Sequence, residues 1–261
     1  MNAKKNTVLI KCIIIFMIAM PLVWGILYPI LEPLSPVWRD TMKYTITAIL
    51  SVLFMKLLWK KKLFSLKSSK FLHSLFTFGL LGLIGAIGAF IFSYEPLVAP
   101  LTFESILGCI ALNVAIAVSE EFLFRGVILN ALLTTYDRKE NKSGLWKAVI
   151  LANVIFGLRH LLNLIQMPEA VIGTIAQVIF TAMAGTYLCA IYLRTNNLWV
   201  CIVIHFLEDF ASSFWTIDHW NAANTLDVSI GTAVGMIAMQ IPYVIFAVLM
   251  INDKKWDRKM K

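Results

Sequence analysis

Charged residues are scarce in this chain, and their scarcity excludes an ordinary soluble domain. Only 15% of the 261 residues are charged, whereas 59% are hydrophobic and the mean hydropathy is +0.79. A soluble domain has about a quarter charged residues and about half apolar ones. The apolar residues also form runs close to the ~20 residues that a helix needs to cross a bilayer. The composition therefore predicts an all-α, polytopic integral membrane protein.

Cysteine is also rare, and its placement excludes two further architectures. The four cysteines are Cys12, Cys109, Cys189 and Cys201. They all fall in apolar runs without paired spacing, so we interpret them as packing residues and not as a disulfide framework or a metal site. No stretch outside the apolar runs is long enough for a soluble domain.

Eight apolar segments are long enough to be transmembrane helices. The expected spans are 9–31, 42–59, 73–93, 104–133, 146–166, 170–193, 197–217 and 229–251. The first lacks a small-residue cleavage site behind it, so it is expected to be a retained anchor. The segment 63–72 has an apolar side and two lysines, which is typical of an interfacial helix. Gly79, Gly82, Gly85 and Gly88 in the third span predict close helix–helix packing.

The basic residues support this topology. With both termini cytoplasmic, 19 of the 23 lysines and arginines lie on the cytoplasmic side, and only Arg39 and Lys43 fall in outer loops. This distribution agrees with the positive-inside rule. The net charge of +8 is explained by this topology and by attraction to anionic headgroups. The expected partners are therefore membrane lipid and a peptide or protein substrate, with no nucleic acid.

The fourth span carries two acids and a base where lipid should surround it. A charged side chain at the bilayer centre costs about 2.5–3.5 kcal/mol on the insertion scale. Glu121 and Arg125 are four residues apart, so they share a helix face and can pair. Glu120 points about 100° away from that face. A carboxylate without such a partner binds a proton more readily in a low dielectric, which suits a general base. The alternative is that both glutamates only bridge helices.

Two further spans carry histidines with a residue four positions away on the same face. Phe156 precedes His160 in the fifth span, and His205 precedes Asp209 in the seventh. Considered alone, His160 could be a packing residue. The His205–Asp209 pair could likewise serve only to satisfy the hydrogen bonding of its own two side chains. At 1.5 Å per residue, however, these groups and Glu120 all lie roughly 13–20 Å from the cytoplasmic ends of their spans. Groups at one depth on three helices are expected to converge on one buried polar site.

Two imidazoles and two carboxylates suit the activation of water. The water could be activated by a general base alone or on a divalent metal such as zinc. The candidate metal ligands are Glu120, His160, His205 and Asp209. The sequence lacks the His-Glu-x-x-His run of zincins, the Gly-x-Ser of rhomboid-type serine proteases and the Gly-x-Gly-Asp of presenilin-like proteases.

Three ordered motifs resemble those of the CPBP family, which comprises the CAAX prenyl endopeptidases of type II and bacteriocin-processing proteins, also called Abi. The motifs are Glu120-Glu121-x-x-x-Arg125, Phe156-x-x-x-His160 and His205-x-x-x-Asp209. The resemblance covers roughly residues 104–210. Each motif is weak alone, but their order on separate spans is specific.

The resemblance implies an eight-helix intramembrane peptidase and assigns a role to each motif. Glu120 corresponds to the water-activating base, and His160 assists it. His205 and Asp209 correspond to the groups thought to stabilise the oxyanion. The supporting residues are Glu121, Arg125 and Phe156.

Asp209 departs from the commoner family pattern, which has Asn at the last position. An amide can donate a hydrogen bond to an oxyanion, whereas an ionised carboxylate cannot. Asp209 is therefore expected to be protonated, to orient His205 or to bind a metal.

The expected organisation is an N-terminal transmembrane region (1–103), a catalytic core (104–210) and a last part (211–261) with the end of the seventh span, the final span and a basic cytoplasmic tail. The expected function is cleavage of a membrane-associated protein or peptide precursor, such as a bacteriocin or signalling-peptide leader, in a bacterial membrane. One alternative is a non-catalytic immunity or scaffold protein of the same family. Another is a proton-coupled transporter, which the lack of inverted repeats disfavours.

Overall fold

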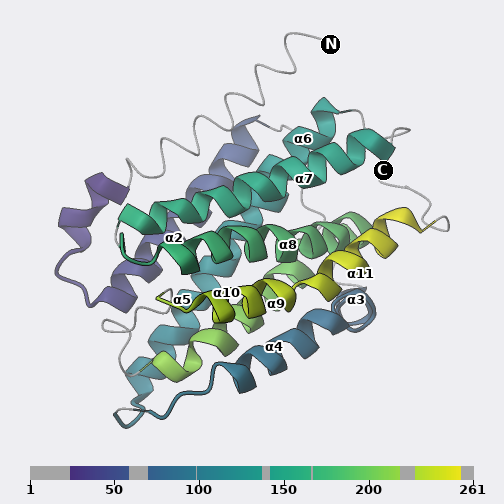
Figure 1. Ribbon diagram of the computed structural model, residues 1–261. Coiled ribbons are helices and arrows are strands. Elements are labelled where there is room, and N and C mark those ends of the chain that lie inside the picture. The colour runs from purple at the N-terminus through teal and green to yellow at the C-terminus, as the bar shows by residue number, and fades with distance from the viewer. Residues whose placement is uncertain are drawn as a thin grey trace. The chain divides into compact units, whose positions relative to one another are not determined.

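The computed structural model describes residues 24–58, 70–97, 99–136, 142–165, 167–217 and 227–253, and every regular element in these ranges is a helix (Figure 1). The predicted all-α fold is confirmed. The expected span 9–31 and the interfacial segment 63–72 lie mostly outside the described residues.

The described helices form two compact units. The first, called the α5–α9 unit, holds a helical segment over 24–31 and α2 (Pro36–Leu58), α3 (Phe71–Phe78), α4 (Leu80–Phe92), α5 (Phe103–Glu121), α9 (Leu198–Ser213) and η4 (Phe214–Thr216). The second, called the α7–α8 unit, holds α6 (Asn130–Thr135), α7 (Lys142–Arg159), η3 (His160–Ile165), α8 (Val171–Thr195), α10 (Ile230–Ala238) and α11 (Ile241–Asn252). The π-helix η2 (Phe122–Leu129) follows α5 and continues into α6.

Packing within each unit centres on a different helix. In the α5–α9 unit, α5 packs against α2 and α9, and α9 also packs against α4. In the α7–α8 unit, α8 packs against α7, η3, α10 and α11. The stacked rings of Tyr187 and Tyr243, with centroids 4.9 Å apart, join α8 to α11.

The helices that carry the first and third motifs both begin at a defined polar cap. Thr102 and Ser105 form a capping box at the start of α5, with each side chain accepting a hydrogen bond from the other residue's backbone N–H. The Asn197 side chain accepts from the Trp199 N–H at the start of α9. Asn196, with φ of 50°, takes the left-handed conformation that ends α8. These caps place the helix starts close to those expected from the sequence.

Within the described ranges, five helices are long and apolar enough to cross a bilayer. They are Phe103–Thr135, Lys142–Ile165, Val171–Thr195, Leu198–Thr216 and Ile230–Asn252. The pair α3 and α4, bent by 67°, adds a sixth if it is one broken span. These helices correspond to the expected third to eighth spans. The count of eight is not confirmed, because 9–31 lies mostly outside the described residues and α2, at the expected second span, is not among the five.

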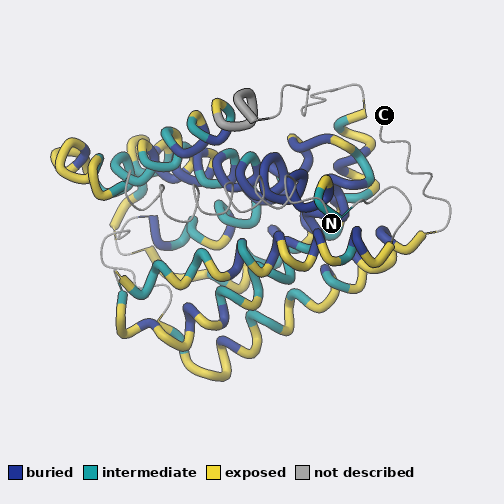
Figure 2. Tube along the Cα trace, turned by 90° about the horizontal axis from the view of Figure 1, so that it is seen from above, coloured by how far each residue is buried: buried dark blue, intermediate teal, exposed yellow. Residues whose placement is uncertain are grey.

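Apolar side chains are exposed on successive turns of these helices, as expected for surfaces in contact with lipid. On α4 they include Leu80, Ile84, Ile87 and Ile91, and on α11 Ile241, Ile245 and Leu249. Figure 2 shows exposed positions recurring in this way along many helices. Contiguous apolar surface of this extent is rare on soluble proteins. The chain is thus built as a multi-pass membrane protein.

A glycine allows α4 to lie close to α9 beside the third motif. A methyl group added to Gly82 would overlap Cγ2 of Ile204, the residue that precedes His205. The predicted role of glycine in helix packing is therefore confirmed at Gly82. It does not extend to Gly88, around which no atom lies within 4 Å of an added methyl group.

Gly82→Ala is expected to destabilise the protein by about 1–3 kcal/mol, because the added methyl group forces α4 and Ile204 apart. Thermal unfolding of the purified protein in detergent measures the effect. Gly88→Ala is the matched control on the same helix, and its melting temperature should stay close to that of the wild type. Equal melting temperatures for the two variants would show that α4 can shift without loss.

Candidate active site

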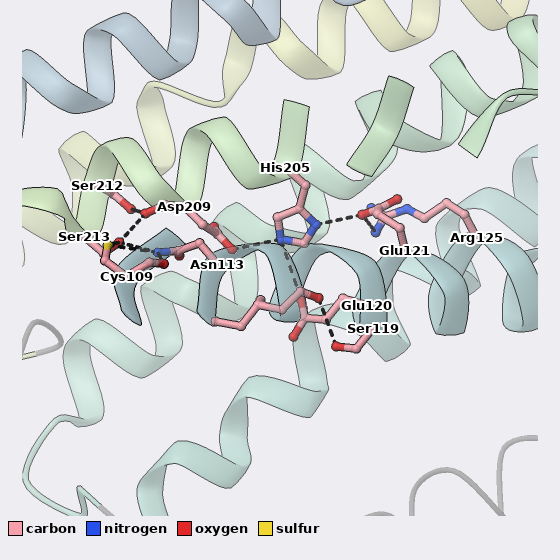
Figure 3. Close-up of polar contacts among 11 residues, drawn as sticks. Cys109, Asn113, Ser119, Glu120, Glu121, Arg125, His205, Asp209, Ser212 and Ser213 are labelled. Atoms are coloured by element: carbon pink, nitrogen blue, oxygen red, sulfur yellow. Dashed lines mark hydrogen bonds and ion pairs between the residues drawn. The ribbon is translucent and has the colours of Figure 1, made fainter. Parts of the chain in front are cut away.

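The histidine of the third motif lies among three carboxylates, two from α5 and one from its own helix (Figure 3). His205 Nδ1 lies 2.8 Å from Glu121 Oε1. Its Nε2 lies 3.2 Å from Asp209 Oδ2 and 3.7 Å from Glu120 Oε2. The imidazole ring thus links the first motif to the third.

Glu121 and Arg125 form a fully buried ion pair, with 2.6 Å between Oε1 and the guanidinium NH1. The pairing expected from their four-residue spacing is present. The interpretation of the sequence gave both residues a supporting role. The same Glu121 oxygen contacts both Arg125 and His205, so this pair also holds the histidine ring.

The contacts of His205 limit where its protons can lie. An Nδ1–H donated to Glu121 leaves Nε2 facing Asp209 and Glu120. Two lone pairs would repel at 3.2 Å, so a proton lies between Nε2 and Asp209 Oδ2, on the ring or on the carboxyl group. Arg125 balances one carboxylate, and the shared proton offsets a second. Asp209 therefore makes the contact with Nε2 that it would need in order to orient His205.

Burial changes along the interface between α5 and α9. Glu121 and Arg125 are inaccessible, and Glu120 and His205 are buried. The Asp209 side chain, by contrast, is 35% exposed. Asp209, which stands where the family more commonly has Asn, is thus the most accessible of the polar side chains around His205.

The second motif lies in the α7–α8 unit. The rings of Phe156 and His160 contact edge to face, with centroids 5.5 Å apart, so Phe156 supports the histidine as their spacing suggested. His160 is the first residue of η3, directly after α7 ends. A hydrogen bond of 2.8 Å from Asn163 to Gln177 fastens η3 to α8. The contacts around His205 join the first and third motifs, and the approach of His160 to them stays a prediction.

The family assignment rests on the segment that holds all three motifs. Residues 102–211 match the family described as Type II CAAX prenyl endopeptidase Rce1-like. This segment is a CPBP-family sequence. No curated protein and no solved structure matches the chain. The match confirms the predicted resemblance and supports a CAAX-type intramembrane protease function. It does not favour the immunity, scaffold or transporter alternatives.

Metal dependence finds no support in the CPBP-family match or in the arrangement of these side chains. Among the residues that the structure describes, no three histidine, cysteine or acidic side chains are arranged to hold a metal ion. Both nitrogens of His205 contact carboxylates, Nδ1 that of Glu121 and Nε2 that of Asp209. The groups thus act as hydrogen-bond and ion-pair partners of one another. They do not fit a zinc ligand set, and we derive no step through a metal.

The π-helix that follows Glu121 in this CPBP-family segment was not predicted. Over Phe122–Leu129 the helix takes the wide i→i+5 pattern, which is rare and is frequently found at functional sites. Arg125 emerges from this turn and reaches back to Glu121. The apolar pattern of the sequence does not distinguish a π-helical turn from an α-helical one, so the sequence carried no usable signal.

A second polar contact between α5 and α9 was also missed. Asn113 is buried and donates from Nδ2 to Ser213 Oγ at 3.0 Å and to the Cys109 carbonyl at 2.9 Å. Cys109, expected to be a simple packing residue, lies 3.8 Å from the Ser213 hydroxyl through its sulfur. A signal was present, because Asn113 is two helical turns before Glu120 on the same face.

Proposed function

We propose that this protein is an intramembrane endopeptidase that hydrolyses a peptide bond of a membrane-associated protein or peptide with activated water. The observation that carries the proposal is the cluster of Glu120, Glu121 and Asp209 around His205, inside apolar helices and within the family-matched segment. Ionisable groups in such a place indicate a functional site by default.

In the proposed reaction Glu120 is the general base. Its carboxylate takes a proton from water, and the hydroxide attacks the carbonyl carbon of the substrate. The tetrahedral oxyanion then collapses, the C–N bond breaks, and Glu120 returns the proton to the leaving amine. The distance of 3.7 Å between Glu120 Oε2 and His205 Nε2 lets both groups reach one substrate oxygen or water.

The other residues support this chemistry. Glu121, neutralised by Arg125, orients the His205 ring so that Nε2 points toward Glu120 and Asp209. The Nε2–H of a protonated ring is a donor for the oxyanion. His160 assists Glu120 in this proposal, as the family resemblance implies, and Phe156 holds its ring.

We further propose the substrate class and the cellular setting. The family description names CAAX prenyl endopeptidases, so a lipidated C-terminal peptide is one substrate class, and an apolar precursor peptide is another. The positive-inside distribution supports cytoplasmic termini, and we propose a bacterial membrane as the setting. The proposed catalytic core is 104–210, between the transmembrane region 1–103 and the final part 211–261.

Incubation of the purified full-length protein in proteoliposomes with two quenched fluorescent peptides tests the proposal. One peptide carries a prenylated cysteine with three further residues, and the other is an unmodified apolar precursor. Cleavage of at least one peptide is expected, with and without a chelator, and not by the Glu120→Gln variant. Loss of cleavage with chelator would show that a metal takes part. Absence of cleavage together with high-affinity binding would favour the immunity-type alternative.

Asp209→Asn is expected to keep cleavage within about tenfold of the wild-type rate, because an amide can contact Nε2 and donate to an oxyanion. Asp209→Ala removes both contacts and should lower the rate much further. Initial rates at saturating peptide compare the two variants. If Asp209→Asn is as inactive as Asp209→Ala, the carboxylate itself is required.

A further inference from the structure

The α5–α9 interface carries two polar contacts at one repeat distance. One is Glu121 with His205, and the other is Asn113 with Ser213 (Figure 3). Eight residues separate Asn113 from Glu121 on α5, and eight separate His205 from Ser213 on α9. The helices run in opposite directions along this interface, so both contacts belong to one register and lie about 12 Å apart along it.

The second contact has a defined hydrogen-bond direction. The Ser213 hydroxyl donates to the Asp209 carbonyl oxygen at 2.7 Å, so its oxygen is left to accept from Asn113. The other hydrogen of the Asn113 amide goes to the Cys109 carbonyl. The Ser212 hydroxyl also donates to the Asp209 carbonyl, at 2.9 Å. The chain of bonds thus runs from α5 through Ser213 to the backbone of Asp209.

Contacts between large apolar side chains specify register only weakly in this setting. Lipid tails are as apolar as leucine, so a helix that slides by one turn exchanges like contacts for like. A buried amide that loses its partner, in contrast, leaves polar atoms in an apolar surrounding. The Asn113–Ser213 bond therefore selects one axial position of α9 against α5.

We infer that Asn113 and Ser213 are positioning residues, which lock α9 against α5 and so hold Asp209 and His205 at the correct depth beside Glu120. This inference rests on the proposed peptidase function. Neither residue touches the reacting groups, and both act through the last turn of α9. A shift of about 1 Å in that turn is enough to lower a reaction rate by up to 10²-fold.

Activity measurements test this role with five variants and whichever of the two fluorescent peptides the wild type cleaves. Asn113→Leu, Ser213→Ala and the double variant are each expected to lower kcat by about 10- to 100-fold, with KM changed by less than about twofold. The double variant should be no worse than either single one, because both remove the same bond. Ser213→Thr retains the hydroxyl and should recover the wild-type rate. Ser51→Ala is the control, since that buried hydroxyl bonds to the Thr47 carbonyl of its own helix, α2.

A measurement independent of activity uses Cys109, whose sulfur contacts both Asn113 and Ser213 and which is 1% exposed. The full-length protein is treated with N-ethylmaleimide, and labelling of Cys109 is followed by peptide mass spectrometry. Cys109 should be protected in the wild type and in Ser51→Ala, and labelled faster in Asn113→Leu and Ser213→Ala.

Two outcomes would overturn the inference. One is a Cys109 that stays protected in both single variants, which would show that the bond does not hold the interface, even if no peptide is cleaved. The other is a wild-type kcat in Asn113→Leu while Glu120→Gln is inactive, which would leave the peptidase function standing. A protein that cleaves neither peptide contradicts the proposed function itself, and the labelling of Cys109 then decides the register.

Discussion

Glu120→Gln is expected to lower the rate of peptide cleavage by about 10²- to 10⁴-fold, the contribution of a general base. The amide has nearly the shape of the carboxylate but cannot take a proton from water. Because Glu120 lies 3.7 Å from His205, and Glu121 still forms the fully buried ion pair with Arg125, neutralisation of Glu120 should leave the fold intact. Single-turnover cleavage of the fluorescent peptides in proteoliposomes measures the rate.

Glu104→Gln is the matched control for this substitution. Glu104 is exposed in the first turn of the same helix, so its neutralisation should leave the rate unchanged. Equal elution volumes and melting temperatures for the two variants would show that folding is not the cause of a loss. A Glu120→Gln protein as active as Glu104→Gln would refute the role of Glu120 as the base.

Arg125→Met is expected to destabilise the protein by about 3–5 kcal/mol. The substitution leaves the fully buried Glu121 carboxylate without its guanidinium, and an uncompensated buried charge is strongly destabilising. Much of the variant should therefore fail to accumulate in the membrane. Thermal unfolding in detergent, together with the amount of folded protein per cell, measures the effect.

Two comparisons separate charge from shape in this prediction. The double variant Arg125→Met/Glu121→Gln removes both charges and should recover much of the lost stability. Arg194→Met breaks an ion pair with Asp253, whose side chain is 43% exposed, so a change of about 0–1 kcal/mol is expected. If Arg125→Met unfolds at the same temperature as Arg194→Met, the Glu121 carboxylate is stabilised by other contacts.

The Glu121–Arg125 pair shows which contacts the spacing of residues along one helix can predict. Residues four apart on a helix must share a face, so the ion pair followed from the sequence. The contact of Glu121 with His205 did not follow from it, because no local rule connects Glu121 with a histidine 84 positions later. That contact depends on the packing of α9 against α5, and it gives the expected supporting residue Glu121 a direct contact with His205.

Asn113 illustrates the opposite case, in which a local signal was present but carried no meaning alone. The amide of a single asparagine in an apolar span could face solvent, donate a hydrogen bond to a carbonyl of its own helix or bind a partner on another helix. Only the position of Ser213 across the interface turns it into a positioning residue. The π-helix after Glu121 had no signal at all, since the i→i+5 pattern depends on how its buried side chains pack.

The sequence by itself determined the helical class, the apolar helices suited to a membrane, the CPBP resemblance and the pairing of residues one turn apart. These follow from composition and from the 3.6-residue period, which act over short distances along the chain. The tertiary structure alone decided that His205 contacts Glu121, that α4 approaches α9 at Gly82 and that Asn113 meets Ser213. The physical reason is that contacts between helices depend on axial register and rotation, which an apolar sequence in an apolar solvent specifies only through its few polar and small residues.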